Sequence, residues 1–516
     1  MKQYSDLEFL RLSKGQKFLH KLAAFLIGIP LGIWHFIVKI GRGIGDFFAA
    51  IGREIADVVQ TFVKGDWKTK LSFLVMGFGN IARGQVLRGI LFLLFEAVFI
   101  FYMVTTGGYW LSMLPSLGKI GPHEEYDPIF DSYTVKFGDN SFKILLYGVL
   151  TIFFIAAFIY TWRLNVKQNK IAEEILAKGK KLKSGKEDLR SLVDDQFHKT
   201  LLALPLTGII VFTVMPIFFM ILVAFTNYDG SHDGFSSALF TWVGLQNFRT
   251  MLTWTGGGGV NYAATFGEIL TWTLIWAFFA TFTNYFLGMF VAMMINKKGI
   301  QFKKVWRTIL VMTIAIPQFI SLLYVSKMFS LNGIVNGWLV DLGIITRAQA
   351  IDFLGSVKNS GLLPRIMVIV INIWIGIPYL MLIATGILMN IPQDLYESSK
   401  IDGANAWQQY TKITLPYMLF ITGPYLLTSF TGNMNNFNVI FLLTGGAPTN
   451  AAASGASGSV GFTDLLITWL YKITMGADSK YYLASVIGIL VFIVVAVITL
   501  VVYNVLPSIK NEEDFQ

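Results

Sequence analysis

Asparagine side chains recur inside two of the most apolar segments of the chain. Those of interest are Asn372 in residues 363–390 and Asn433, Asn435, Asn436 and Asn438 in residues 413–443. Amide groups are costly to bury in a membrane, so they normally face a cavity or a neighbouring helix. Asn433 and Asn436 are three residues apart, which predicts that they share one helical face. The same rule puts Asn372, Gly376 and Tyr379 on one face of the earlier segment.

Aromatic side chains accompany these amides and indicate what they could bind. Trp374 and Phe437 are close to the amides in sequence, and Pro378 frees a backbone carbonyl in the first segment. Amides hydrogen-bond hydroxyl groups, and aromatic rings stack on the apolar faces of sugars. Because the set carries no net charge, it predicts a site for a neutral, polyhydroxylated ligand. The alternative is that the asparagines only hold helices together.

The sequence patterns that would indicate catalysis or nucleotide binding are missing or incomplete. Residues 179–187, GKKLKSGKE, have one residue too many between their glycines for a phosphate-binding loop, and Glu187 would repel phosphate. The chain has no cysteine and no H-E-x-x-H, and its five histidines are scattered. We therefore expect that the chain is not an enzyme and holds no metal.

A polar, amphipathic stretch separates the two amide-bearing segments. Residues 397–416 read ESSKIDGANAWQQYTKITLP. Pro392 offers a helix start, since proline is tolerated at the first helical position. Gly403 can then bend or break the helix, because glycine accepts backbone angles closed to other residues. A loop between two membrane spans needs only a short turn, so a loop with its own helical pattern predicts a surface that binds a partner.

This stretch resembles the cytoplasmic coupling loop of permease subunits in binding-protein-dependent ABC importers. The family pattern is a Glu-Ala-Ala-like triplet, then Asp-Gly-Ala, then Ile-x-Leu-Pro. The matching residues here are Glu397-Ser398-Ser399, Asp402-Gly403-Ala404 and Ile413-Thr414-Leu415-Pro416. The resemblance implies that an ATPase contacts the loop 391–416 through six residues: Glu397, Ser398, Ser399, Asp402, Gly403 and Ala404. Without the resemblance, an interfacial helix that has no partner would be the alternative.

From about Trp242 onward the chain is similar to the larger permease subunit of maltose and maltodextrin importers. The landmarks are residues 242–248 (WVGLQNF), 372–376 (NIWIG), 445–448 (GGAP) and 462–466 (FTDLL). In that family the positions matching Asn372, Gly376, Tyr379, Asn433 and Asn436 line the sugar site in the middle of the membrane. Gly432, Ile314 and Gln318 depart from the family pattern, so the length of the ligand and its affinity stay open.

The composition indicates an all-α polytopic membrane protein. The chain has 516 residues, of which 54% are hydrophobic and 14% charged, whereas about 25% are charged in a soluble domain. Several apolar runs exceed the roughly 18 residues needed to cross a membrane. We predict eight spans at about 86–105, 143–162, 201–226, 268–295, 305–330, 363–390, 413–443 and 481–506. The resemblance assigns the last six to a type I ABC importer permease core.

The distribution of charge predicts the orientation of these spans. Residues 163–200 carry ten Lys or Arg, whereas residues 106–142 carry five acidic residues and two basic ones. By the positive-inside rule, residues 1–85 and 163–200 are cytoplasmic and 106–142 are outside. Eight spans then leave both termini in the cytoplasm. The net charge of +10 is explained by these loops and does not indicate nucleic-acid binding.

The chain divides into three predicted parts. Residues 1–85 form a cytoplasmic or interfacial arm, 86–200 hold two accessory spans and a basic linker, and 201–516 form the core. Within the arm, residues 44–63 place apolar side chains on one helical face and charged ones on the other. This pattern is typical of a helix lying in the membrane surface. The run 22–38 is borderline for a span, and we interpret it as part of the same arm.

The resemblance implies a transmembrane subunit of an ATP-driven importer for maltose, maltodextrin or a related oligosaccharide in a bacterial cell membrane. Its partners would be a second, similar permease subunit, two ATPase subunits that hold ATP and Mg, and an extracellular solute-binding protein. The outer loop 444–480 would contact that binding protein, or it is a plain linker. The first alternative is an importer of the same type for glycerol phosphate or a polyamine. An ion-coupled secondary transporter and a structural membrane scaffold are further alternatives.

Overall fold

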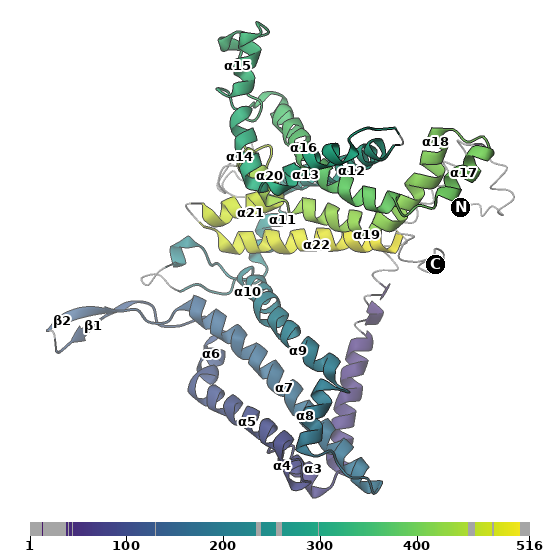
Figure 1. Cartoon of the computed structure of the whole chain (residues 1–516). Helices are drawn as coiled ribbons and strands as arrows, with labels where there is room; N and C mark the ends of the chain where they lie inside the picture. The colour runs from purple at the N-terminus through teal and green to yellow at the C-terminus, as the bar shows by residue number, and fades with distance from the viewer. Residues whose placement is uncertain are drawn as a thin grey trace. The chain divides into compact units, whose positions relative to one another are not determined.

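The computed structural model describes residues 13, 38–39, 41–43, 45–129, 131–233, 239–253, 261–297, 299–451, 460–476 and 479–505. It has two compact units, residues 1–244 (unit 1) and 245–516 (unit 2) (Figure 1). The first helix of the core that we predicted to start at residue 201 therefore belongs to unit 1. The borderline run 22–38 lies outside the described residues apart from its last residue.

Unit 1 is helical apart from one small hairpin. Its described residues form a helix at 45–64, α3 (Trp67–Leu71), α4 (Phe78–Ala82), α5 (Val86–Tyr102), α6 (Gly108–Met113), β1 (His123–Asp127), β2 (Ser132–Lys136), α7 (Ser141–Ala177), α8 (Gly185–Val193), α9 (Phe197–Ile209) and α10 (Met215–Val223). Short π-helical turns, η1 (Met103–Gly107) and η2 (Ile210–Val214), join α5 to α6 and α9 to α10, and η3 (Gly230–His232) follows α10. The helix predicted at 44–63 is therefore present as a helix.

Aromatic contacts hold the long helices of unit 1 together. Phe158 of α7 stacks on Phe99 of α5 with ring centroids 3.9 Å apart, and Phe153 of α7 meets Phe218 of α10 edge-on at 5.7 Å. Such pairs add stabilisation beyond the area that they bury. As a result α7 is the helix on which the rest of unit 1 is assembled.

The hairpin in the loop 106–142 was not predicted. β1 and β2 pair antiparallel with His123 opposite Lys136. The cross-strand pair Tyr126 and Tyr133 has ring centroids 5.6 Å apart, a pairing that stabilises antiparallel strands. The strands are short and largely exposed. Because β1 is rich in acidic residues, it lacks the alternation of apolar and polar side chains by which strands are predicted.

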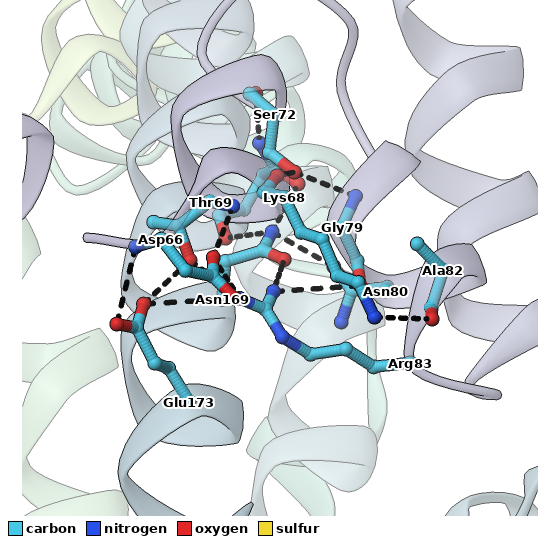
Figure 2. Close-up of polar contacts among 11 residues, drawn as sticks. Asp66, Lys68, Thr69, Ser72, Gly79, Asn80, Ala82, Arg83, Asn169 and Glu173 are labelled. Carbon is cyan, nitrogen blue, oxygen red and sulfur yellow. Dashed lines mark hydrogen bonds and ion pairs between the residues drawn. The ribbon is translucent and has the colours of Figure 1, made fainter.

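A buried arginine ties the segment before α5 to the C-terminal half of α7 (Figure 2). The Arg83 side chain is 1% exposed and donates from Nη2 to Asp66 Oδ1 at 2.5 Å and to Thr69 Oγ1 at 2.7 Å. Its Nη1 donates to Asn169 Oδ1 at 2.8 Å, and Glu173 Oε2 accepts from Thr69 Oγ1 at 2.8 Å. We call these five residues the Arg83 cluster. A buried guanidinium is tolerated because every partner around it is charged or polar.

Apart from one isolated β-bridge, the regular elements in the described residues of unit 2 are all helices. It comprises α11 (Gln246–Leu252), α12 (Tyr262–Asn296), α13 (Lys303–Ala315), α14 (Gln318–Met328), α15 (Ile334–Asp341), η4 (Arg347–Gln349), α16 (Lys358–Leu388), α17 (Gln393–Ile401), α18 (Ala406–Gln409), η5 (Tyr410–Thr414), α19 (Leu415–Met434), α20 (Phe437–Leu443), α21 (Leu466–Met475) and α22 (Tyr481–Val505). In both units together, seven described helices are long and apolar enough to cross a membrane, and eight if one bent pair counts as a span. The prediction of a helical fold with many spans is confirmed.

Two helices that were predicted as continuous are broken. In the span 305–330, α13 and α14 meet at an angle of 91°. Pro317 explains this break, because it disfavours the helical conformation of the residue before it, and Ile316 is extended. In the span 413–443, α19 ends at Met434. The Asn436 side chain then caps α20 by accepting a hydrogen bond from the Val439 amide at 3.3 Å.

The long helix α12 forms the centre of unit 2. It packs against α16 and α19, and its Trp276 is fully buried in a cluster with residues of α14, α16 and α20. A β-carbon at Gly376 would lie 2.3 Å from Asn284 Nδ2, and one at Gly288 would lie 2.7 Å from the Leu380 β-carbon. The two glycines therefore let α12 and α16 approach closely at two levels.

Candidate functional site

The coupling segment, residues 391–416, folds as two short helices joined at a glycine. Pro392 is the N-cap residue of α17, so the helix starts at Gln393, one position later than predicted. Gly403 has φ +77°, the left-handed conformation expected of a glycine that ends a helix. A β-carbon at Gly403 would meet nothing within 4 Å. Only the backbone angle, and not space, favours glycine at this position.

Side-chain hydrogen bonds brace the two short helices against each other. Gln409 Nε2 donates to Ser399 Oγ at 2.8 Å, and the Tyr396 and Thr414 hydroxyls are 2.8 Å apart. Asn405 caps α18 in a reciprocal capping box with its N3 residue. The segment is thus a preformed elbow and not a flexible linker.

The six predicted coupling residues fall into two groups on this elbow. Glu397, Ser398, Asp402 and Gly403 are exposed, whereas Ser399 and Ala404 are half-buried inside it. Beside the exposed group lie two large apolar side chains, Ile401 and Trp407, which are 88% and 70% exposed. Exposed apolar side chains rimmed by polar ones are typical of a docking surface.

The three predicted ligand residues of α16 have different surroundings. Asn372 is buried, and its Nδ2 has no hydrogen-bond partner among the described residues. Gly376 contacts Asn284 of α12, whose Oδ1 is likewise buried without a partner in the described part of the chain. Tyr379 is 51% exposed. Buried amide atoms without a hydrogen-bond partner are costly. The contact between α12 and α16 is therefore a candidate polar site.

Asn433 and Asn436 touch each other although they do not share a helix. Asn433 is near the end of α19 and Asn436 precedes α20, and Asn436 Nδ2 donates to Asn433 Oδ1 at 3.3 Å. The prediction that they share one helical face was wrong, because α19 ends between them. Asn433 is held by α12, since its Nδ2 donates to Thr281 Oγ1 at 3.0 Å and its carbonyl accepts from Trp276 Nε1 at 3.1 Å.

A cavity of about 310 Å³ opens where the break between α13 and α14 faces α16. Its lining includes Thr313, Gln318, Ser321, Trp374, Gly376 and Tyr379, and it contains no charged side chain. Of the five predicted ligand residues, Gly376 and Tyr379 line this cavity, and the three asparagines do not. An uncharged cavity that combines aromatic rings, hydroxyls and an amide suits a neutral ligand with many hydroxyl groups.

Sequence analysis missed the contribution of α12 and of the broken helix. Thr281 and Asn284 are three residues apart inside a predicted span, so the spacing rule used for the asparagines could have found them. Thr313 and Ser321 lie on opposite sides of Pro317, and only the bend brings both to one cavity. That bend was not apparent from hydropathy.

A buried ion pair anchors the loop between α20 and α21. The Asp464 side chain is fully buried and its Oδ2 accepts from Lys472 Nζ at 2.6 Å and from the Gly461 amide at 2.7 Å. Thr449 and Gly461 form a β-bridge that closes the base of the loop. The Gly/Ala/Ser-rich tip at 452–459 lies outside the described residues. The base of the predicted binding-protein loop is therefore fixed to unit 2.

Within the described residues, no group of three or more His, Cys, Asp or Glu side chains could hold a metal ion. The candidate functional features of unit 2 are the cavity beside the α13–α14 break and the elbow at 391–416.

Comparison with known proteins gives a consistent result. Residues 284–510 match the family model described as "Binding-protein-dependent transport system inner membrane component". The chain is 31% identical over 458 residues to the maltodextrin transport system permease protein MdxF of Bacillus subtilis, covering 88% of this chain and 98% of that protein. It is 29% identical over 453 residues to the maltodextrin transport system permease protein MalC of Streptococcus pneumoniae, covering 86% and 97%. It is also 31% identical over 444 residues to the galactooligosaccharides transport system permease protein GanP of Bacillus subtilis, covering 85% and 97%.

Proposed function

Since this chain belongs to the family of binding-protein-dependent transport system inner membrane components, we propose that it is the permease subunit through which a neutral oligosaccharide enters the cell. As a multi-pass inner-membrane permease it is not itself a catalyst. Permease subunits of ABC importers carry no cofactor, because ATP binds to the ATPase. What the proposal adds is the class of substrate, the residues that contact it and the surface that receives the ATPase.

The class of substrate follows from the chemistry of the cavity and of the amides behind it. The cavity beside the α13–α14 break has hydroxyl, amide and aromatic lining without charge. Glycerol phosphate or a polyamine would instead need a charged partner in such a site. The names of MdxF, MalC and GanP also refer to oligosaccharides. We propose a maltodextrin or a related oligosaccharide, bound by Asn372, Gly376, Tyr379, Asn433 and Asn436.

The partners follow from the two polar surfaces of unit 2. We assign the exposed coupling residues, with Glu397 and Asp402 among them, to a groove of the ATPase. The anchored loop 444–480 is assigned to an extracellular solute-binding protein, and a second, similar permease subunit completes the pathway. The basic loops support an orientation with both termini in the cytoplasm. ATP binding would then favour one permease conformation through its contacts with the elbow.

One experiment tests the substrate class directly. The assembled transporter, with its ATPase and binding protein, is reconstituted in lipid and its ATP hydrolysis is measured with different solutes. Maltodextrins are expected to stimulate hydrolysis, and galactooligosaccharides are the nearest competitor. Stimulation by glycerol phosphate or a polyamine instead would contradict the proposed substrate. Transport of solute down an ion gradient by the purified chain alone would contradict the ATP-driven mechanism.

Thr281→Val is expected to weaken the response to sugar without preventing assembly. The Thr281 side chain is buried and accepts the hydrogen bond that orients Asn433, and valine has almost the same shape. Loss of one such bond is worth about 1 kcal/mol, or about fivefold in the sugar concentration for half-maximal ATP hydrolysis. Thr281→Ser should restore the response. Thr283→Val is the matched control, because among the described residues the Thr283 hydroxyl bonds only to a carbonyl of its own helix.

A further inference from the structure

The helix at 45–64 is amphipathic, and its apolar side is the exposed one. Six large apolar side chains, which we call the apolar stripe, are between 39% and 64% exposed: Phe47, Phe48, Ile51, Ile55, Val59 and Phe62. Phe47 and Phe48 are adjacent and the others follow at intervals of three or four residues, so the six form one helical face. In a soluble protein this face would be turned toward the core and the polar face toward water.

The polar face of this helix is bound to α7. Arg163 donates from Nε to Glu54 at 2.7 Å and from Nη2 to Asp57 at 2.5 Å, and Lys170 Nζ donates to Asp57 at 2.6 Å. The hydrogen bond from Lys170 lowers the pKa of the Asp57 carboxyl below its ordinary value, against the opposing effect of burial. The carboxylate is therefore charged at neutral pH, and the ion pairs fix which face of the helix turns inward.

The end of the helix is held by a second anchor, the Arg83 cluster shown in Figure 2. The Asp66 amide donates to Glu173 Oε1 at 3.2 Å, which joins the chain just after the helix to α7. With α7 attached at Asp57 and again at Asp66, the helix cannot roll about its own axis without breaking these ion pairs and hydrogen bonds. The outward direction of the apolar stripe is thus built into the fold of unit 1.

The level of the helix along α7 is set by the same contacts. The apolar part of α7 ends at Trp162, and the next residue is Arg163, which pairs with the helix. Phe62 of the stripe meets Phe73, and Phe73 meets Trp162, with ring centroids 5.2 Å and 5.6 Å apart. Tryptophan and arginine at the end of a span mark the boundary between acyl chains and headgroups. The helix lies beside the C-terminal end of α7, and the two line one cavity.

We propose that this helix lies in the inner face of the membrane, with its apolar stripe inserted among the lipid acyl chains. Lipid is the occupant that the surroundings favour. The stripe is connected through Phe62 and Phe73 to Trp162 of α7, and exposed Arg53 and Lys64 lie along the same helix. Basic side chains beside an apolar face suit anionic headgroups. The helix thereby fixes the accessory spans to the cytoplasmic leaflet, separately from the transport pathway.

Single-cysteine labelling tests this placement, because the chain has no cysteine of its own. Phe48→Cys and Ile55→Cys report on the stripe, and Gln60→Cys, an exposed residue of the polar side, is the matched control. Each variant carries a fluorophore and is studied in the assembled transporter in nanodiscs of anionic and zwitterionic lipid. The lipids carry a spin label at a shallow or a deep acyl position, and iodide serves as the aqueous quencher.

The stripe labels are expected to be quenched most by the shallow spin label and little by iodide, with the reverse for Gln60→Cys. Quenching of the stripe mainly by iodide would overturn the proposal, as would quenching mainly by the deep spin label, which would indicate a spanning helix. Protection from all three quenchers would show that a protein covers the stripe, and would overturn it as well. None of these outcomes bears on which sugar stimulates ATP hydrolysis.

Asp57→Asn in the Ile55→Cys background tests the orienting role of the ion pairs. With the charge removed, shallow quenching of the label should fall and iodide quenching should rise. Quenching unchanged from the parent would overturn the claim that Asp57 sets the direction of the stripe. The Asp57→Asn change is conservative in shape, and expression in the membrane fraction checks that the chain still folds.

Discussion

Replacing Gly403 by valine is expected to release most of the ATPase from the permease. The φ of +77° is readily adopted by glycine, whereas a left-handed residue with a β-carbon costs roughly 1–2 kcal/mol, and a β-branched one is disfavoured further. The elbow would relax to another angle between α17 and α18, and its exposed coupling residues would no longer form the surface that the groove requires. Co-purification of the ATPase should fall on the order of tenfold.

The surroundings of Gly403 make this test specific. Because a β-carbon there meets nothing within 4 Å, steric clash cannot explain a loss. Gly403→Asn should retain more ATPase than Gly403→Val, since asparagine tolerates the left-handed region. Gly386→Ala is the matched control, a glycine within α16 that also has open space and has no positive φ. Membrane insertion should be normal in all three, and full pull-down of the ATPase by Gly403→Val would remove the elbow from the coupling role.

The parts of the fold that the sequence predicted well are those set by local signals. Pro392 and Gly403 bound the first coupling helix through their own backbone preferences, which act whatever surrounds them. The helix at 45–64 follows in the same way from its periodicity. In each case the residues within one or two turns determine the outcome.

The parts that were missed depend on contacts between distant segments. Arg83 is isolated in sequence from Asn169 and Glu173, and only the pairing of the pre-α5 segment with α7 makes a buried arginine stable. Periodicity identified the apolar side of the helix at 45–64, but not that Arg163 would hold its polar side. Hydropathy likewise treated 413–443 as one span, because a single asparagine cap does not change the mean polarity of a long apolar window.

The proposed ligand residues also divide into those predicted by local spacing and those that depend on contacts between distant segments. Tyr379 and Gly376 are on a regular helix, so their spacing alone predicted a common face, and both line the cavity. Asn433 and Asn436 are separated by the end of α19, yet they still meet through a side-chain hydrogen bond. Their partners on α12 come from residues about 150 positions earlier, a pairing that no local rule contains.

Asn436→Leu is expected to lower sugar transport roughly ten- to a hundredfold while leaving assembly intact, because a buried hydrogen bond to a ligand hydroxyl is worth about 1–3 kcal/mol once its partner is left unpaired. Leucine also removes the amide that donates to Asn433 Oδ1. The measurement is sugar uptake into vesicles, normalised to the amount of assembled transporter. Uptake at the wild-type level would remove Asn436 from the ligand site.

The same side chain caps α20, so a loss of transport has two possible origins that must be separated. Asn436→Ser keeps an N-cap oxygen, since serine caps helices about as well as asparagine, but it removes the amide donor and shortens the reach into the site. If Asn436 contacts sugar, the serine variant should remain impaired and the half-saturating sugar concentration should rise. If Asn436 only caps α20, serine should restore uptake in full. Asn435→Leu is the matched control. Its side chain is exposed, and within the part of the chain that the structure describes its amide bonds only to a carbonyl one turn earlier. Its loss should therefore leave sugar uptake near the parent value.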